Sequence, residues 1–366
     1  MAQRILVGVP PKNHVLLSYD EIEGLTDLGY NCKPVTYGRN NANSGKAQKL
    51  LGTIAKAFNV VKELYAFNPR ILYLNSRFEP VGSTRDFITI LIIKLFYYRK
   101  LNIVIKTHGS DISVLEKTSF FYRKLVVPTL RKHVDAWFFL SSDEKELVRK
   151  YDPVIANKIF ITANIIDPGR SVASAAFREK YALDERKFKV LFCGRIVKEK
   201  GVFSLLQSIP MLSCKENCLF VFVGDGAHLQ ELKQLAESLN ITKYTRFPGF
   251  VPDHECDHFY ANADMLAFPT YDNEGFPMAL FKSVAAGLPV ITTRIRAAKD
   301  HLTSPDNVLW VDKESAESIA TAIDTLYNDH ALRNSMSENN RRIAKKFTRT
   351  QVCAGMAKVM MSINHP

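Results

Sequence analysis

The sequence predicts an α/β protein of two doubly wound domains, each built around a parallel β-sheet. Three observations lead to this prediction. The chain has 366 residues, too many for one domain of ordinary size. Short β-rich runs alternate with helical stretches from end to end, and the pattern breaks once, around residues 164–186. A content of 46% hydrophobic and 23% charged residues argues against extensive disorder, collagen-like repeats or a coiled coil.

The elements follow in order along the chain. Continuous apolar runs, typical of strands buried on both faces, lie at 5–9, 71–74, 103–106, 136–140 and 159–162, and again at 188–193, 219–223, 265–268, 289–292 and 308–311. Ser141 followed by Glu144 predicts a capping box that opens a helix. We therefore expect a first domain at 1–165, a linker at 166–187 and a second domain at 188–345. A C-terminal helix is expected at 346–366, and packing back on the first domain is one arrangement open to it.

Parallel sheets bind ligands beyond the carboxyl ends of their strands, so two such domains predict an active site in a cleft between them. The N-terminus lacks the apolar core and cleavage site of a signal peptide. The most hydrophobic stretch, 87–98, contains Lys94 and is too short to span a membrane. Six cysteines without a CxxC pair favour a reducing cytoplasm, with Cys214 and Cys218 as ordinary buried thiols rather than metal ligands.

The positive charge of the chain lies mainly in its first half. Residues 1–165 hold 24 basic and 14 acidic side chains, a net of +10, against +2 for the remainder of a chain whose total is +12. The segments 87–100 and 120–132 interleave aromatic rings with Lys and Arg, which suits an anionic membrane surface. An equally favoured alternative is that these two segments form core helices with charged ends. No nucleic-acid-binding motif accompanies the charge, so we expect no nucleic-acid partner.

Two glycine turns follow strands of the second half. Gly194 is followed by Arg195 and Lys200 at the start of a helix, and this arrangement suits a phosphate group, although solvated loop cations would give the same pattern. The second turn has Gly224 and Gly226, but Leu229 stands where a dinucleotide fingerprint needs its third glycine. A tight turn is therefore favoured over a nicotinamide or flavin site.

The segment from Phe268 to Val290 is the most specific signal in the chain. A strand leads into a loop that presents Glu274 beside Gly275, and an apolar helix then ends at Gly287. A carboxylate next to the N–H groups of a helix start can bind sugar hydroxyls. The alternative is that Glu274 only caps the helix and binds no ligand.

These motifs resemble the GT-B glycosyltransferases, and within them the retaining enzymes of glycosyltransferase family 4. The resemblance rests on Gly194-Arg195 with Lys200-Gly201, on Val223 to Gly226, on Pro248 to Val251, and above all on Glu274-Gly275-Phe276-Pro277 through Ala286 to Val290. It covers nearly all of the second half. In the first half, His108-Gly109-Ser110-Asp111 is similar to the HGxD turn of the family.

The resemblance implies a role for each matching residue. Arg195 and Lys200 would bind the donor diphosphate, Glu274 would bind the donor sugar, and His108 would reach the transferred sugar, so these four are the expected catalytic residues. The expected donor-binding residues are Gly8, Gly194, Gly224, Phe250, Val251, Gly275, Phe276, Pro277, Met278 and Lys282. The family's second glutamate is replaced by Lys282, which donates hydrogen bonds but cannot accept them. Two loops also depart from the family pattern, at residues 10–13 and 294–299.

No Asp-x-Asp pair occurs in the sequence, and fixed cations can stabilise a leaving diphosphate, so we expect neither a metal nor a cofactor. The expected function is retaining transfer of a sugar, from a UDP-sugar slightly in preference to a GDP-sugar, to a glycan or lipid-linked glycan acceptor in polysaccharide synthesis. The expected location is the cytoplasm, with the inner face of the membrane as a peripheral site. A nucleotide-sugar epimerase of similar fold and a catalytically degenerate nucleotide-sugar-binding protein are the alternatives.

Overall fold

The computed structural model describes residues 3–11, 14–38, 45–117, 119–166, 173–272 and 274–363. The chain divides into two compact units, which we call unit 1 (Met1–Ile165 with Phe347–Pro366) and unit 2 (Ile166–Lys346). Residues 167–172 of the expected linker lie outside the described residues, as do Lys12 and Asn13 of the first loop and Asn273 beside Glu274.

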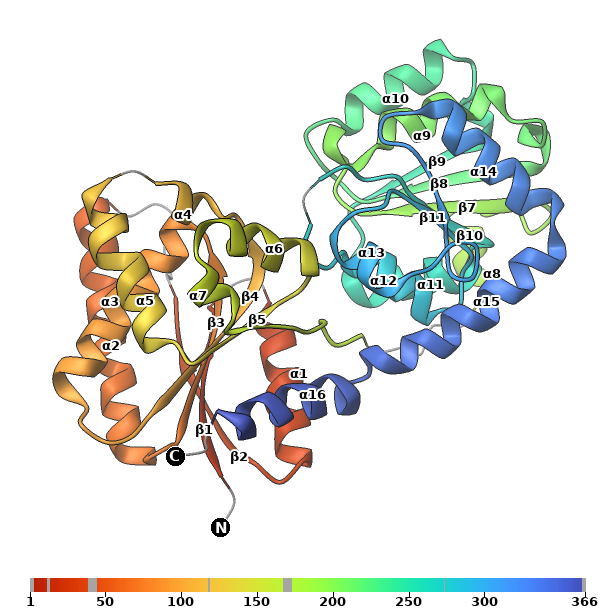
Figure 1. The fold of residues 1–366 in the computed structure, drawn as a ribbon. Coiled ribbons are helices and arrows are strands. Elements are labelled where there is room, and N and C mark those ends of the chain that lie inside the picture. The colour runs from red at the N-terminus through yellow and green to blue at the C-terminus, as the bar shows by residue number, and fades with distance from the viewer. Residues whose placement is uncertain are drawn as a thin grey trace. The chain divides into compact units, whose positions relative to one another are not determined.

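Unit 1 is built on a six-stranded parallel sheet (Figure 1). The spatial order is β2-β1-β3-β4-β5-β6, and the strands are β1 (Arg4–Val9), β2 (Asn31–Thr36), β3 (Ile71–Phe78), β4 (Asn102–Ser110), β5 (Ala136–Phe139) and β6 (Ile159–Ile161). All the predicted runs of this half form strands. Strand β2 was not predicted, because its polar composition and Pro34 break the apolar pattern, and a proline is tolerated at the edge of a sheet.

The helices of unit 1 cover both faces of its sheet. They are α1 (Val15–Asp27), α2 (Lys46–Phe67), α3 (Pro80–Phe96), α4 (Ser113–Glu116), α5 (Val127–His133), α6 (Ser142–Tyr151), α7 (Pro153–Ala156) and α16 (Arg349–Ser362). The predicted cap of α6 is confirmed, since Ser141 Oγ accepts a hydrogen bond of 3.3 Å from the backbone N–H of Glu144. Helix α16 packs on α1, where Arg349 forms an ion pair of 2.7 Å with Glu23.

Unit 2 repeats the architecture with a second six-stranded parallel sheet. Its order is β12-β11-β10-β7-β8-β9, and the strands are β7 (Phe188–Cys193), β8 (Cys218–Val223), β9 (Thr245–Gly249), β10 (Met265–Phe268), β11 (Val290–Thr292) and β12 (Leu309–Trp310). Its helices are α8 (Ala175–Lys180), α9 (Val202–Ser208), α10 (Leu229–Ser238), α11 (Asp253–Asn262), α12 (Met278–Ala285), α13 (Arg296–His301), α14 (Ala316–Asn328) and α15 (His330–Ala344). Strand β9, again an edge strand with a proline, was not predicted.

In each unit, the strand order alone indicates where a ligand would bind. In unit 2 the chain winds outward from β7 through β8 and β9, then returns to start again at β10 on the other side of β7. In unit 1 the corresponding reversal lies between β1 and β3. Helices diverge at such a switch point and leave a crevice beyond the carboxyl ends of the two strands. The loops after β7 and β10, and after β1 and β3, are therefore where binding residues are expected.

The two aromatic and basic segments of unit 1 are divided between core and surface. Helix α3 buries Phe87, Ile90 and Ile93, while Leu95 at 54% and Tyr98 at 82% exposure face solvent. The second segment exposes residues including Phe120, Phe121 and Leu125. Within the described ranges, no helix combines the length and apolar character that crossing a membrane requires.

Candidate active site

The switch point of unit 2 brings two predicted cations and the predicted glutamate together. Arg195 lies in the turn after β7, Lys200 ends a short 3-10 helix at Lys198–Lys200, and Glu274 lies in the loop between β10 and α12. Lys200 is only 2% exposed, and its Nζ donates to Asp272 Oδ2 at 2.8 Å and to Glu274 Oε1. Arg195, 69% exposed, lies with a guanidinium nitrogen 3.6 Å from the same oxygen of Asp272. The arrangement is one buried cation between two acids, with a second cation at the rim.

The backbone of the β10 loop is fixed against the β7 loop. The carbonyl oxygen of Glu199 accepts hydrogen bonds from Tyr271 N at 2.9 Å, Asp272 N at 3.1 Å and Thr270 Oγ1 at 3.2 Å. Gly201, with φ of 72°, also packs on this loop, because a Cβ there would lie 2.1 Å from the carbonyl oxygen of Pro269. The two loops therefore hold the acids in place through main-chain contacts.

The glycine turns after β7, β8 and β9 are stacked along the same edge of the sheet. Gly194 N donates to Val223 O at 3.0 Å, and Gly224 N donates to Gly249 O at 2.9 Å. A Cβ at Gly224, whose φ is 134°, would lie 1.9 Å from the carbonyl oxygen of Gly194. Gly224 thus has a structural reason to be glycine, because the backbone of the neighbouring loop approaches too closely for a side chain, and Gly194 has a φ of 154° that other residues rarely adopt.

Glu274 is followed by the start of α12. Gly275, Phe276 and Pro277 form the turn, and Met278 is the first residue of the helix. Phe276 is 6% exposed and stacks on Phe281 with ring centroids 3.8 Å apart. This stacking fixes the turn to its own helix, which begins four residues after Glu274, and the Glu274 carboxylate is 27% exposed.

The remaining predicted donor-binding residues of unit 2 lie around α11 and α12. Lys282 is ion-paired with Asp257 of α11 at 3.3 Å, and both side chains are partly exposed, at 25% and 29%. Phe250 follows β9 and is 76% exposed, whereas Val251 is 6% exposed. The chain therefore has a carboxylate in contact with position 282, carried by the neighbouring helix.

In unit 1, the predicted residue His108 lies on β4 beside the β1/β3 switch point. It is 7% exposed, and its Nε2 lies 2.7 Å from Oδ1 of Asn75 on β3. The His14 ring, from the loop after β1, stacks on it with centroids 4.5 Å apart and an interplanar angle of 10°. The His108 Nδ1 atom is buried and has no hydrogen-bond partner among the described residues.

Burial lowers the pKa of His108 well below the ordinary value of 6.5, and the positive charges of Lys106, His14 and Arg77 lower it further. The pKa of His14 is also lowered, first by burial and then by Arg77 and Lys106. His108 is therefore neutral at pH 7. Because the Asn75 oxygen accepts, Nε2 carries the proton, and Nδ1 offers an acceptor lone pair.

Gly8, the one predicted donor-binding residue of unit 1, lies inside β1. A Cβ at this position would be 2.7 Å from Cδ2 of Leu74 and 3.1 Å from Cβ of Tyr37. Close packing of the sheet thus accounts for this glycine without a ligand, and a donor contact there stays a prediction.

Sequence reasoning assigned no role to three residues that the structure places at these sites. Asp272 lies in the segment from Phe268 to Val290 but has no predicted role of its own, and Asn75 and His14 lie outside every predicted motif. Only their positions could have indicated a role in binding. Asp272 follows β10, Asn75 lies on β3 and His14 follows β1, and each of these strands borders a switch point.

Part of the chain matches a known family of proteins. Residues 174–343, nearly all of unit 2, match the family model of the glycosyl transferases group 1. The capsular polysaccharide biosynthesis glycosyltransferase CapM of Staphylococcus aureus is 32% identical over 187 residues, 46% of this chain and 48% of CapM. A GDP-mannose-dependent alpha-(1-6)-phosphatidylinositol monomannoside mannosyltransferase of Mycobacterium tuberculosis is 30% identical over 164 residues, 43% of this chain and 42% of that enzyme. The matches thus span less than half of these relatives.

The fold is shared over the whole chain. The crystal structure of Anabaena Alr3699/HepE in complex with UDP and glucose superposes with a TM-score of 0.73 at 16% sequence identity, and it covers 99% of this chain and 100% of that one. The predicted fold class, two Rossmann-like domains of the GT-B type, is therefore confirmed.

Proposed function

We propose that the chain is a retaining glycosyltransferase that moves a sugar from a nucleotide-diphosphate sugar to a glycan acceptor. The observation that carries this proposal is the grouping of Arg195, Lys200 and Glu274 at the switch point of unit 2. Cations beside strand-to-helix loops suit a diphosphate, and a carboxylate beside a helix start suits sugar hydroxyls. The match of residues 174–343 to the glycosyl transferases group 1 family includes all three residues and supports the proposal.

The donor is proposed to be a UDP-sugar rather than a GDP-sugar. The structure of HepE, which shares the fold, contains UDP and glucose. The mycobacterial relative is named as GDP-mannose-dependent, so GDP-sugars are the competing donors. Asp257, paired with Lys282, supplies a carboxylate that could accept from ribose hydroxyls at the position where the resembled family has glutamate.

The proposed reaction needs only side chains that the chain provides. The bond between the sugar's anomeric carbon and the diphosphate oxygen breaks, and its electron pair stays on the diphosphate. The acceptor hydroxyl oxygen bonds to the same face of that carbon, and its proton passes to the leaving diphosphate. Arg195 and Lys200 stabilise the negative charge as it grows, which gives the reaction no need for a metal. Neutral His108 offers the lone pair of its buried Nδ1 atom to a sugar hydroxyl.

The first test is a thermal-shift screen of UDP, GDP and their sugars with the intact chain, followed by transfer assays with the donor that stabilises it. Arg195→Ala should lose most of the stabilisation. Lys198→Ala, which removes an exposed lysine from the same loop, is the matched control and should keep it. Absence of stabilisation by every nucleotide would contradict the proposal. Turnover without an acceptor would favour an epimerase, and binding without turnover across suitable acceptors would favour a degenerate binding protein.

We further propose that the acceptor is a lipid-linked or surface glycan and that unit 1 contacts an anionic membrane. CapM is named for capsular polysaccharide biosynthesis and the mycobacterial relative for a phosphatidylinositol mannoside, which supports this acceptor class. The exposed apolar side chains of unit 1 include Leu91, Leu95, Phe96, Tyr98 and Phe120. Exposed cations lie in the same two segments, so rings could enter the interface while the charges attract acidic lipid.

Cosedimentation with neutral and acidic liposomes tests this contact. The variant changes five exposed cations to Gln: Arg99, Lys100, Arg123, Lys124 and Lys132. Arg131 is left unchanged because it is ion-paired with Asp152. The control changes five exposed cations of unit 2 to Gln: Lys243, Lys313, Arg342, Lys345 and Lys346. Binding to acidic liposomes should fall with salt and in the first variant only, since such attraction is screened over about 8 Å. Equal recovery by neutral and acidic liposomes would show that the segments are structural.

A further inference from the structure

A pocket with a volume of about 680 Å³ lies in unit 2 at the edge where the strands begin. Lys187, Phe188 and Lys189 line it at the start of β7, Asp264 lines it just before β10, and Pro289 lines it just before β11. The candidate active site is at the opposite side of the sheet, beyond the carboxyl ends of the strands. None of the residues predicted to bind the donor lines this pocket.

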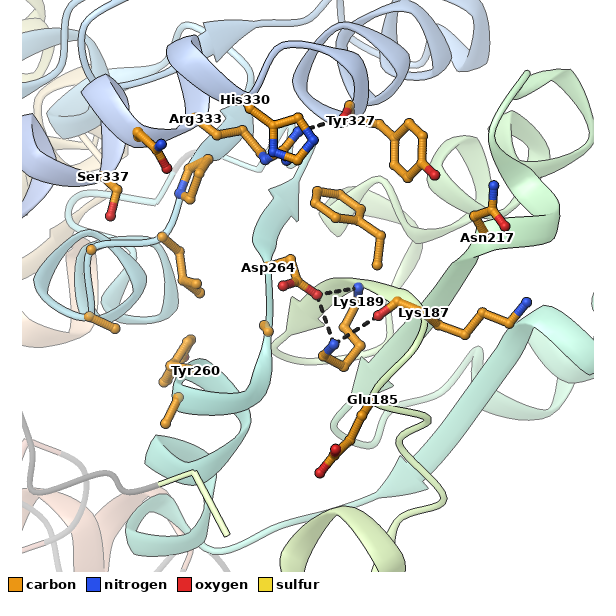
Figure 2. Close-up of a pocket in the computed structure, with 18 of the residues that line it drawn as sticks. Glu185, Lys187, Lys189, Asn217, Tyr260, Asp264, Tyr327, His330, Arg333 and Ser337 are labelled. Atoms are coloured by element: carbon orange, nitrogen blue, oxygen red, sulfur yellow. Dashed lines mark hydrogen bonds and ion pairs between the residues drawn. The ribbon is translucent and has the colours of Figure 1, made fainter. Parts of the chain in front are cut away.

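One face of α15 forms a wall of the pocket. His330, Arg333, Ser337 and Arg341 follow one another at spacings of three or four residues, and Asn334 lies four residues after His330, so they share one side of the helix. Figure 2 shows Arg333, His330 and Ser337 along this wall, with Lys189 and Asp264 across from them. The side of α15 that packs into the unit instead carries the buried residues Met336, Asn340 and Ala344. The wall is thus a polar helix face directed into a cavity.

Several charges around the pocket are already neutralised. Lys189 Nζ pairs with Asp264 at 2.9 Å, and Arg186 pairs with Asp184 at 3.0 Å. Glu185 is ion-paired with Arg178. Glu185 and Asp264, the two acids that line the pocket, are both used in these pairs, so neither neutralises another cation of the pocket.

Three further cations have no acidic partner among the described residues. Lys187 Nζ donates to the carbonyl oxygen of Glu216, and Arg333 donates to the carbonyl oxygens of Leu326 and Tyr327. Carbonyl groups hold these side chains in place but leave the positive charges uncompensated. Arg341 has neither a hydrogen bond nor an ion pair within the described part of the chain. Three cations around one pocket produce a positive potential that an anion would reduce.

Packing positions these groups without any acid. A Cβ at Gly287 would lie 2.6 Å from Nε of Arg341, so the arginine side chain lies directly over the turn between α12 and β11. The Arg333 guanidinium carbon lies 5.2 Å from the centre of the Phe188 ring. Tyr327 meets the same ring edge to face at 5.4 Å. The pocket therefore combines oriented cations with an aromatic wall and with the amide and hydroxyl groups of Asn334 and Ser337.

We propose that this pocket binds a small sugar that carries a phosphate or carboxylate group, at a site separate from the proposed donor site. Its volume is within the range of small-molecule pockets, roughly 300–1,000 Å³. The cations would bind the anionic group by charge-assisted hydrogen bonds, and the amide and hydroxyl groups would bind sugar hydroxyls. The inference uses residues of unit 2 that take no part in the proposed transfer reaction, so it stands independently of that proposal.

Isothermal titration of the full chain with glucose 6-phosphate, glucuronate and glucose tests the site. We expect either anionic sugar, or both, to bind at least tenfold more tightly than glucose. Arg341→Gln should weaken that binding about tenfold or more, as expected for the loss of one charge-assisted hydrogen bond. Arg342→Gln, which removes the next arginine of α15, is the matched control and should bind like the parent. Thermal melts verify that both variants fold.

Arg195→Ala separates this pocket from the donor site, because Arg195 lies at the other edge of the sheet. This variant should bind the anionic sugars like the parent, whatever it does to turnover. The proposal would be overturned by an absence of binding at millimolar concentrations, by unchanged binding in Arg341→Gln, or by loss of binding in Arg195→Ala. The last result would assign the anion to the candidate active site instead.

Discussion

Replacement of Lys200 by alanine should damage both the stability of the protein and the proposed turnover. Lys200 is 2% exposed and lies between Asp272 and Glu274, so its removal leaves the two carboxylates without the buried cation that pairs with both, and only the exposed Arg195 remains near Asp272. Breaking a fully buried ion pair costs roughly 3–5 kcal/mol. The two acids are 34% and 27% exposed, so water screens them, and we expect a smaller loss of about 1–3 kcal/mol. Turnover should fall by roughly 100-fold or more, because a preorganised charge at the leaving group is lost.

The two effects can be separated with a second substitution. In Lys200→Ala with Asp272→Asn, the repulsion between acids is relieved, so urea denaturation should recover most of the lost stability. Turnover should stay low, because the cation is still absent. Both variants are assayed with the donor found in the thermal-shift screen, next to Lys198→Ala. Near-normal turnover in folded Lys200→Ala would refute the assignment of Lys200 to the diphosphate. Unchanged stability would show that the ion pairs of Lys200 with the two acids do not stabilise the fold.

Three further predictions concern pH, metal and the Lys282 contact. The pKa of His108 in the folded chain is well below 6.5. As the pH falls below about 6.5, the unfolded chain therefore takes up a proton that the folded chain does not, and the free energy of unfolding, measured by urea denaturation, should decrease. The decrease should be smaller in His108→Gln. An equal pH dependence in parent and variant would contradict this. Turnover should survive EDTA, and a loss that magnesium or manganese restores would show that a metal is needed. The side chains of Lys282 and Asp257 are partly exposed, so their ion pair should be weak. A double-mutant cycle with Lys282→Glu and Asp257→Lys should give a coupling free energy of up to about 1 kcal/mol. The double variant should be more stable than either single variant. Additive effects would show that the pair does not interact in solution.

The strands that the sequence predicted and the two that it did not differ in their composition. Strands such as β3 and β8 are covered on both faces, so their residues form continuous apolar runs that are visible without a structure. Strands β2 and β9 are at the edges, where one side is open and proline is tolerated, and each contains one, Pro34 and Pro248. The other two edge strands, β6 and β12, are apolar runs and were predicted, so the apolar pattern misses only the edge strands that a proline and polar residues interrupt.

The same limit applies to the candidate active site. The motifs pointed to Arg195, Lys200 and Glu274 one at a time, each with a role towards a ligand. Lys200 and Glu274 are 74 residues apart, and they meet because β7 and β10 are neighbours at the switch point, which depends on the strand order rather than on either motif. The contact of both acids with Lys200 could not be predicted from spacing for the same reason.

That contact has a consequence for how the proposed donor would bind. The loop that carries Asp272 and Glu274 is fixed by main-chain hydrogen bonds to Glu199, so the acids keep their positions whether or not Lys200 is bound to them. A diphosphate that approaches Lys200 would compete with both carboxylates for the same ammonium group. Arg195, mostly exposed and 3.6 Å from Asp272, can turn towards the ligand without breaking a buried contact. We therefore expect Arg195 to set the affinity for the nucleotide, and Lys200 to act more strongly on turnover, because its bond to the diphosphate gains strength as negative charge grows there.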